Sequence, residues 1–161
     1  MLRVAFIVNH FPLLSETFIL NQITGLIERG HHVDIYTCTS GDLNKIHPDV
    51  EKYDLLKHTY YLPEIPQNFL WRSLKAISLL SKNFTKKPEK ILRSLNIFQY
   101  GKLATSLRLF YAAIAGANKG TYDIVHCQFG TLSFWGMLFR TINAPKAKLV
   151  VSFRGYDISQ F

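Results

Sequence analysis

The chain is poor in cysteine: it has 161 residues and two cysteines, Cys38 and Cys127, which lie 89 positions apart. Two thiols at this separation supply neither a disulfide framework nor the spacing of a metal site. We therefore expect free, buried cysteines in a reducing compartment, and no bound metal.

Long apolar runs are also lacking. No segment approaches the roughly 18 consecutive apolar residues of a membrane span. The apolar start of the chain turns polar at Asn9, which is too early for a signal peptide. These absences predict a soluble protein of the cytoplasm. The first strand-like run is not followed by G-x-G-x-x-G, which argues against a dinucleotide-binding oxidoreductase.

Acidic residues are nearly absent from positions 67 to 120, which hold ten lysines and arginines against one acid. The rest of the chain holds nine bases and ten acids, so this segment accounts for the whole net charge of +8. Aromatic residues such as Trp71 and Tyr100 lie among the bases, as in elements that bind membrane interfaces. No nucleic-acid recognition motif accompanies the charge. We therefore expect an anionic membrane surface as a partner and no nucleic acid, with a solvated helix face as the alternative. The bases expected to face the membrane are Lys86, Lys87, Lys90 and Arg93.

Apolar runs alternate with amphipathic segments along the chain. The expected strands are Val4–Val8, His32–Cys38, His58–Leu62, Tyr122–His126 and Lys148–Phe153. A helix is expected between the first two strands, with Ser15 as its N-cap, and another at Leu132–Thr141. Between the third and fourth strands the pattern is helical, ending in one long helix from about Phe98 to Asn118. This order predicts a single Rossmann-like α/β domain over 1–161, with a doubly wound, mostly parallel sheet and a basic helical insertion at about 67–120.

Polar side chains follow the strands of the expected sheet. His10 follows the first strand, His126 and Gln128 the fourth, and Arg154 and Asp157 the last. In an open parallel sheet, ligands bind outside the carboxyl ends of the strands. The sequence therefore predicts a ligand site at this edge.

Three segments carry a resemblance to a known family. They are FPLLSETFI at 11–19 with GHHV at 30–33, DIVHCQFG at 123–130, and VVSFRGYDI at 150–158. In this order the chain resembles family 4 glycosyltransferases, and most closely the branch that builds exopolysaccharides such as colanic acid. Two departures stand out: Asn9–Pro12 replaces a glycine-rich turn, and Arg154 stands where the family usually has a histidine before Gly155.

The resemblance implies a GT-B enzyme, in which two Rossmann-like domains face each other across a cleft. This chain would be the N-terminal, acceptor-side domain, and the C-terminal donor-binding domain, with its pair of glutamates eight positions apart, would be missing from it. The implied reaction is the retaining, metal-independent transfer of a hexose from a nucleotide sugar to a lipid-linked or oligosaccharide acceptor. The nucleotide sugar is then a substrate, and no cofactor is expected.

The candidate site residues have alternatives that the sequence leaves open. His126 is the catalytic candidate, because a histidine that ends an inner strand can hydrogen-bond a sugar; a core histidine is the alternative. The expected acceptor-binding residues are His10, Ser15, Glu16 and Gln128, although Ser15 and Glu16 also suit a helix cap. The expected donor-facing residues are Arg154, Gly155 and Asp157, although an Arg154–Asp157 salt bridge is equally consistent with the pattern.

The function that these features favour is acceptor binding within a hexosyltransferase of surface-polysaccharide synthesis, inactive as a fragment and peripheral on the inner face of the membrane. The chain stops soon after a strand, so we expect a piece of a longer protein. The alternative is a non-enzymatic glycan-binding module, or one subunit of a split glycosyltransferase.

Overall fold

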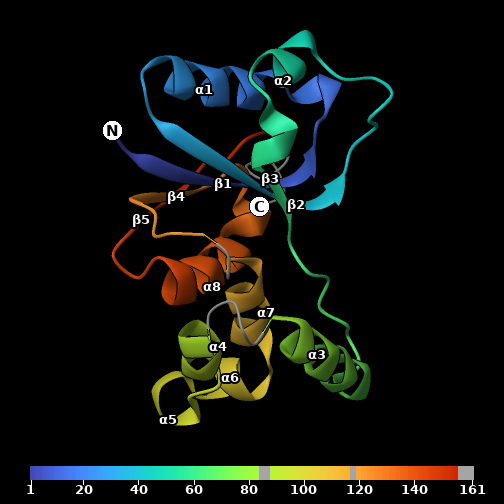
Figure 1. The fold of residues 1–161 in the computed structure, drawn as a ribbon, viewed down its shortest axis with the longest axis vertical. Coiled ribbons are helices and arrows are strands. Elements are labelled where there is room, and N and C mark those ends of the chain that lie inside the picture. Colours follow the sequence, from blue (N-terminus) through green and yellow to red (C-terminus); the bar gives the residue numbers. More distant parts are fainter. Residues whose placement is uncertain (84–87, 117–118, 156–161) are drawn as a thin grey trace.

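The computed structural model describes residues 1–83, 88–116 and 119–155. In this part of the chain, five parallel strands form one sheet in the order β3-β2-β1-β4-β5 (Figure 1). The strands are β1 (Arg3–Phe11), β2 (His32–Ser40), β3 (Thr59–Tyr61), β4 (Ile124–Cys127) and β5 (Lys148–Val151). Helices cover both faces of the sheet, which confirms the predicted Rossmann-like α/β architecture.

The central strand is β1, and its sequence explains its position. Every side chain of Val4–Val8 is 2% exposed or less, and a strand covered on both faces needs such a continuous apolar run. β1 pairs with β2 as far as Phe11 but with β4 only as far as Ile7 opposite Cys127. Beyond Cys127 the chain therefore leaves the sheet, and the residues that follow are placed at its carboxyl edge.

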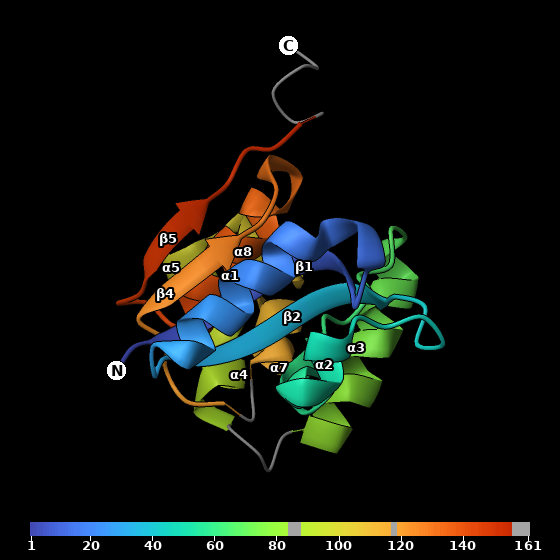
Figure 2. The same ribbon diagram turned by 90° about the horizontal axis from the view of Figure 1, so that it is seen from above.

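One helix on each face of the sheet covers the central strands (Figure 2). On one face, α1 (Thr17–Glu28) buries Ile19, Leu20 and Ile23 against the sheet. α1 ends where Gly30 adopts a φ of 77°, a left-handed conformation that glycine tolerates. On the other face, α8 (Ser133–Asn143) packs beside β4, and α2 (Pro48–Lys52) lies on the α1 side (Figure 1).

The helical insertion lies between β3 and β4. It contains α3 (Phe69–Asn83), α4 (Pro88–Ser94), α5 (Ile97–Tyr100), α6 (Lys102–Thr105) and α7 (Arg108–Ala115). The prediction of one long helix from about Phe98 was wrong. Gly101 and Leu107 have φ values of 51° and 60°, and an α-helix cannot pass through the left-handed region. The insertion joins the domain because Leu109, Ala112 and Ala113 of α7 pack against Leu138 and Ile142 of α8.

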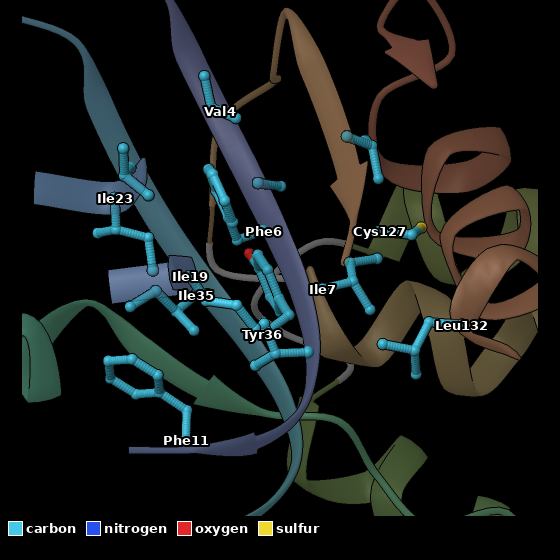
Figure 3. Packing of buried hydrophobic residues seen from close by; sticks show 14 of the residues in the cluster. Val4, Phe6, Ile7, Phe11, Ile19, Ile23, Ile35, Tyr36, Cys127 and Leu132 are labelled. Atoms are coloured by element: carbon cyan, nitrogen blue, oxygen red, sulfur yellow. The ribbon is translucent and has the colours of Figure 1, made fainter. Parts of the chain in front are cut away.

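The main core lies on both sides of β1, between α1 and α8 (Figure 3). Phe6 and Ile7 are neighbours on β1 and point to opposite faces of the sheet. Cys127 is fully buried and Cys38 is half-buried, and both are free thiols, as expected. Burial raises the pKa of Cys127 to about 12, so this thiol is a packing group. The described residues also form short 3-10 turns at η1 (Leu14–Glu16), η2 (Leu55–His58) and η3 (Gly130–Leu132).

Among the residues that the structure describes, β5 is an edge strand, and Leu149 and Val150 are 36% and 41% exposed. Within the same residues, each helix is too short or too polar to cross a lipid bilayer.

Candidate functional site

His126 lies near the carboxyl end of β4, on the α1 side of the sheet. Its ring packs on Phe6 with the ring centroids 5.0 Å apart. On its other side, Nε2 lies 2.8 Å from the hydroxyl oxygen of Ser152, which follows β5. Because β4 and β5 are parallel and adjacent, the two strand ends bring this pair together. His126 is therefore half-buried in the core and hydrogen-bonded at the predicted edge.

Two more predicted residues join His126. The Gln128 amide nitrogen donates to Gln22 Oε1 of α1 at 3.1 Å and lies 3.4 Å from His126 Nδ1. The Arg154 guanidinium stacks on the ring of Phe18, also on α1, with its carbon 4.5 Å from the ring centroid. Phe18 and Gln22 are four positions apart and so lie on one helix face. We call His126, Gln128, Ser152 and Arg154, with Phe18 and Gln22, the edge cluster.

The edge cluster favours the neutral form of His126. Burial lowers the pKa of His126, and the positive charge of Arg154 lowers this pKa further. The Gln128 amide nitrogen faces Nδ1 as a donor, so the neutral ring is best accommodated with its proton on Nε2, donated to the Ser152 oxygen. The Gln128 contact at 3.4 Å is long, so Nδ1 of this neutral ring can still accept a hydrogen bond from a sugar hydroxyl.

Two polar atoms of the edge cluster lack hydrogen-bond partners among the described residues. They are Gln128 Oε1 and Arg154 Nε, and both are buried. Buried polar atoms are nearly always paired in native proteins. An acceptor and a donor close to His126 are therefore available for a further hydrogen bond within the described part of the chain.

A groove of about 410 Å³ runs from the edge cluster along the sheet beside α1. Val4, Ile124 and Val150 contribute apolar lining, and His126 and Gln22 contribute polar atoms. α1 covers β1 but leaves the outer strands β4 and β5 open on this side (Figure 2). The groove gives His126 access from the surface of the described residues.

His10 and Glu16 form a separate group at the end of β1. Both line a small pocket under α2 with His47. His10 Nδ1 shares a hydrogen bond with the Thr39 hydroxyl at the end of β2. Burial raises the pKa of Glu16, and the nearby His10 partly offsets this rise in pKa. The structure thus pairs two predicted acceptor residues with each other and places them apart from the edge cluster.

Ser15 does not cap a helix. It lies in η1, exposed, and α1 begins after Glu16, whose side chain makes no capping hydrogen bond. The prediction of Ser15 as N-cap was wrong because η1 adds a turn before the helix starts. Gly155 adopts a φ of 56° in the turn after Arg154. Asp157 lies outside the described residues, so the predicted Arg154–Asp157 salt bridge stays a prediction.

The basic residues expected at a membrane have different surroundings. The Lys90 ammonium donates to the carbonyls of Gly116 and Lys119 at 3.2 and 3.4 Å and is directed into the domain. Arg93 donates from Nε to the Tyr100 hydroxyl at 3.0 Å. For these two residues the structure therefore offers an internal role that the charge pattern did not predict. Lys86 and Lys87 lie outside the described residues.

Sequence reasoning missed one cluster at the opposite, amino edge of the sheet. His32 and Asp34 of β2 lie beside His58, which directly precedes β3. Asp34 is completely buried. The third residue, His58, comes 24 positions after Asp34 in the sequence. This separation matches no metal-ligand motif, so the sequence did not indicate that the three residues meet. Only the parallel pairing of β2 with β3 brings His58 close.

The architecture is a Rossmann-like α/β sheet, and the edge cluster places polar groups at the carboxyl edge of its parallel strands, where such domains bind ligands. Comparison with known proteins narrows this class. Over 99% of its length, the chain is 34% identical to the amylovoran biosynthesis glycosyltransferase AmsK of Erwinia amylovora. Over 98%, it is 32% and 31% identical to proteins from Salmonella typhimurium and Escherichia coli described as colanic acid biosynthesis glycosyltransferases, WcaL.

These similarities confirm the resemblance to exopolysaccharide glycosyltransferases that three sequence segments predicted. The chain spans only 38–39% of the length of these relatives. No protein-family profile matches the chain, and no solved structure matches it significantly.

Proposed function

We propose that this chain is the acceptor-side domain of a retaining GT-B glycosyltransferase in surface-polysaccharide synthesis. The whole enzyme would transfer a hexose from a nucleotide sugar to a lipid-linked or oligosaccharide acceptor. The observation that carries the proposal is the similarity of nearly the entire chain to three exopolysaccharide glycosyltransferases. The edge cluster supports it, because its polar atoms lie where a parallel α/β domain binds ligands.

In this proposal His126 hydrogen-bonds a hydroxyl of the reacting sugar. Its lowered pKa supports this role, because the neutral ring has a nitrogen that can accept a hydrogen bond from a hydroxyl, whereas the protonated ring has none. Arg154 supplies a fixed positive charge toward the donor diphosphate, on which negative charge accumulates as the sugar departs. Gln128 orients the His126 ring and offers Oε1 as an acceptor. These groups position and stabilise charge, and no metal takes part.

His10 and Glu16 are proposed to hold a more distant part of the acceptor. Their pocket lies at the end of β1, and the edge cluster lies at the ends of the neighbouring β4 and β5. An acceptor oligosaccharide that crosses adjacent strand ends would meet both groups. Ser15, exposed beside them, is proposed as a rim contact.

The helical insertion is proposed to rest on the inner face of an anionic membrane, where a lipid-linked acceptor is found. An exposed apolar stripe on α3 supports this role: Leu70, Trp71, Leu74 and Ile77 are 57–72% exposed. The surrounding segment 67–120 carries a net charge of +9. Apolar side chains beside an excess of bases are typical of interfacial elements.

The test compares the 161-residue chain with the longer, two-domain protein that this proposal implies. Alone, the chain is expected neither to hydrolyse UDP- or GDP-hexoses nor to transfer from them, because the donor-binding half is absent. The full-length protein is expected to transfer to lipid-linked acceptor in bacterial membranes. Turnover by the chain alone contradicts the two-domain proposal.

The alternative is a glycan-binding module without enzymatic activity, or one subunit of a split enzyme. The gene sequence beyond codon 161 distinguishes these alternatives from the two-domain enzyme. A frame that continues into a second domain with two glutamates eight positions apart supports the enzyme. A stop codon supports the module, and a separate downstream gene for the donor half supports the split enzyme.

A further inference from the structure

The amino edge of the sheet brings two histidines and one carboxylate together. His32 and Asp34 are two positions apart on β2, so both side chains point to the same face of the sheet. β3 pairs with β2 with Thr59 opposite Ile35, and His58 therefore stands next to Asp34. One side-chain ligand atom from each of these residues lies within 4.8 Å of those of the other two.

Buried tyrosines hold the carboxylate in place. The Tyr122 hydroxyl donates to Asp34 Oδ2 at 2.7 Å, and Tyr36 and Tyr122 share a hydrogen bond of 2.8 Å. Such outer partners fix the orientation of metal-binding carboxylates in proteins. The other oxygen, Asp34 Oδ1, is buried and has no hydrogen-bond partner among the described residues.

Two separations within this cluster are close to those between ligands of one metal ion, and each histidine faces a different oxygen of Asp34. His32 Nε2 lies 3.3 Å from Asp34 Oδ2, and His58 Nδ1 lies 3.6 Å from Asp34 Oδ1. Two ligands at about 2.1 Å from a tetrahedral Zn²⁺ are about 3.4 Å apart. By contrast, 3.6 Å is too long for a hydrogen bond, so direct pairing of His58 with the carboxylate does not satisfy Oδ1.

We propose that His32, Asp34 and His58 bind one divalent transition-metal ion, with Zn²⁺ as the best fit to two imidazoles and a carboxylate. The histidine side chains are 32% and 41% exposed, which leaves the remaining coordination position to water. The ion would tie the start of β2 to the turn before β3. The expectation of no metal rested on spacing along the sequence, and this set forms only in the fold. The proposal is independent of the proposed glycosyltransferase function.

The positive charge of Arg3 lies beside the proposed ion, so its removal should change the metal affinity in a predictable direction. Its guanidinium lies 3.7 Å from Asp34 Oδ2 and over the ring of Tyr122. A positive charge at this distance lowers the affinity for a second cation. Arg3→Gln is therefore expected to bind Zn²⁺ more tightly than the unchanged chain, whereas weaker or unchanged binding speaks against an ion beside Asp34.

The main experiment titrates the tag-free chain with Zn²⁺ by calorimetry and with Co²⁺ by visible absorption. We expect one ion per chain, an affinity at least tenfold lower in His32→Gln and in His58→Gln, and little change in His31→Gln. His31 is the matched control because it is adjacent to His32 and also partly exposed, but it precedes β2, is not part of the three-residue cluster, and accepts a hydrogen bond from the Leu2 N–H through Nδ1.

A stability measurement keeps the outcome clear if a variant folds less well. Zn²⁺ is expected to raise the Tm of the unchanged chain and of His31→Gln, because a ligand that binds only the folded state stabilises it, and to leave the Tm of His58→Gln unchanged. The proposal is overturned if the unchanged chain shows no saturable Zn²⁺ binding. It is equally overturned if His31→Gln weakens binding as much as His32→Gln does.

Discussion

The imidazole of His126 lies between the ring of Phe6 and the Ser152 hydroxyl, which is 2.8 Å from Nε2. The first contact belongs to the core and the second to the edge cluster. Removing the ring therefore tests two different quantities, the stability of the domain and the proposed hydrogen bond to a sugar.

In the proposed full-length enzyme, His126→Ala is expected to lower kcat/KM about 10–100-fold, the effect of losing one hydrogen bond that strengthens in the transition state. The Tm is expected to fall by only a few degrees, because the half-buried ring leaves a cavity that water can enter. Ser152→Ala is the control, since it removes the ring's partner and keeps the ring. A large loss of Tm with near-normal kcat/KM would assign His126 to structure alone.

The lowered pKa of His126 predicts a dependence of stability on pH. The unfolded chain takes up a proton on this histidine near pH 6.5, and the folded protein does so only at lower pH. Protonation therefore favours the unfolded state, and the contribution of His126 to stability is present above pH 6.5 and lost as the pH falls.

Thermal unfolding between pH 7.5 and pH 5 checks this sign. His126→Gln keeps a hydrogen-bonding side chain but does not titrate, so its Tm is expected to fall less over this range than that of the unchanged chain. All other titrating groups are common to both proteins. A steeper fall for His126→Gln would mean that burial does not disfavour the protonated ring.

Among the elements, α8 and β4 approach so closely that one position permits only glycine. A Cβ on Gly136 of α8 would lie 2.1 Å from Cys127 Sγ and 3.2 Å from Leu149 Cδ1. The position sits in regular helix, so the constraint is space and not backbone conformation. This close approach holds α8 against the strand that carries His126.

Gly136→Ala is expected to lower the free energy of unfolding by about 1–3 kcal/mol, because overpacking forces the helix away from the sheet. Cys127→Ala in the same chain removes the sulfur and should recover part of the loss. Urea unfolding of both single variants and the double variant measures this coupling. Strictly additive effects would show that the methyl group finds room elsewhere.

At the scale of the whole molecule, the helical insertion carries both the excess positive charge and the exposed apolar stripe of α3. Anionic phosphatidylglycerol vesicles are expected to bind the chain and neutral phosphatidylcholine vesicles to bind it less. Salt is expected to weaken this binding, since charge attraction is screened over about 8 Å at physiological ionic strength. Co-sedimentation measures both effects.

Two variants separate the charge from the apolar stripe. Lys82→Gln with Lys102→Gln is expected to reduce the preference for anionic vesicles. Leu74→Gln with Ile77→Gln is expected to reduce binding at all salt concentrations. Leu43→Gln, an exposed leucine outside the insertion, is the control for apolar residues. Equal binding to both vesicle types would indicate apolar adhesion without a charge contribution.

The sequence predicted the sheet and its two flanking helices because strands and helices differ in the period of their apolar residues. It could not predict the break at Leu107, because no local signal marks a leucine that adopts a left-handed φ. It grouped His10 with His126 because both follow strands, whereas the structure pairs His10 with Thr39. Which side chains meet across strand ends depends on register and loop paths, and a single sequence does not contain these.

The outer side of β5 has a further consequence for how the domain exchanges protons with solvent. The N–H of Lys148 donates to Asp123, directly before β4, and that of Ser152 donates to Cys127 of β4. The alternate N–H groups of Leu149 and Val151 therefore point away from β4, and the structure describes no strand beyond them. Deuterium uptake along β5 is therefore expected to alternate, fast at Leu149 and Val151 and slow at Val150, while β1 stays protected from Val4 to Ile7, where it pairs on both sides. In a longer protein that adds a sixth strand here, the alternation would disappear, so hydrogen exchange at two amides would report whether the sheet has been extended.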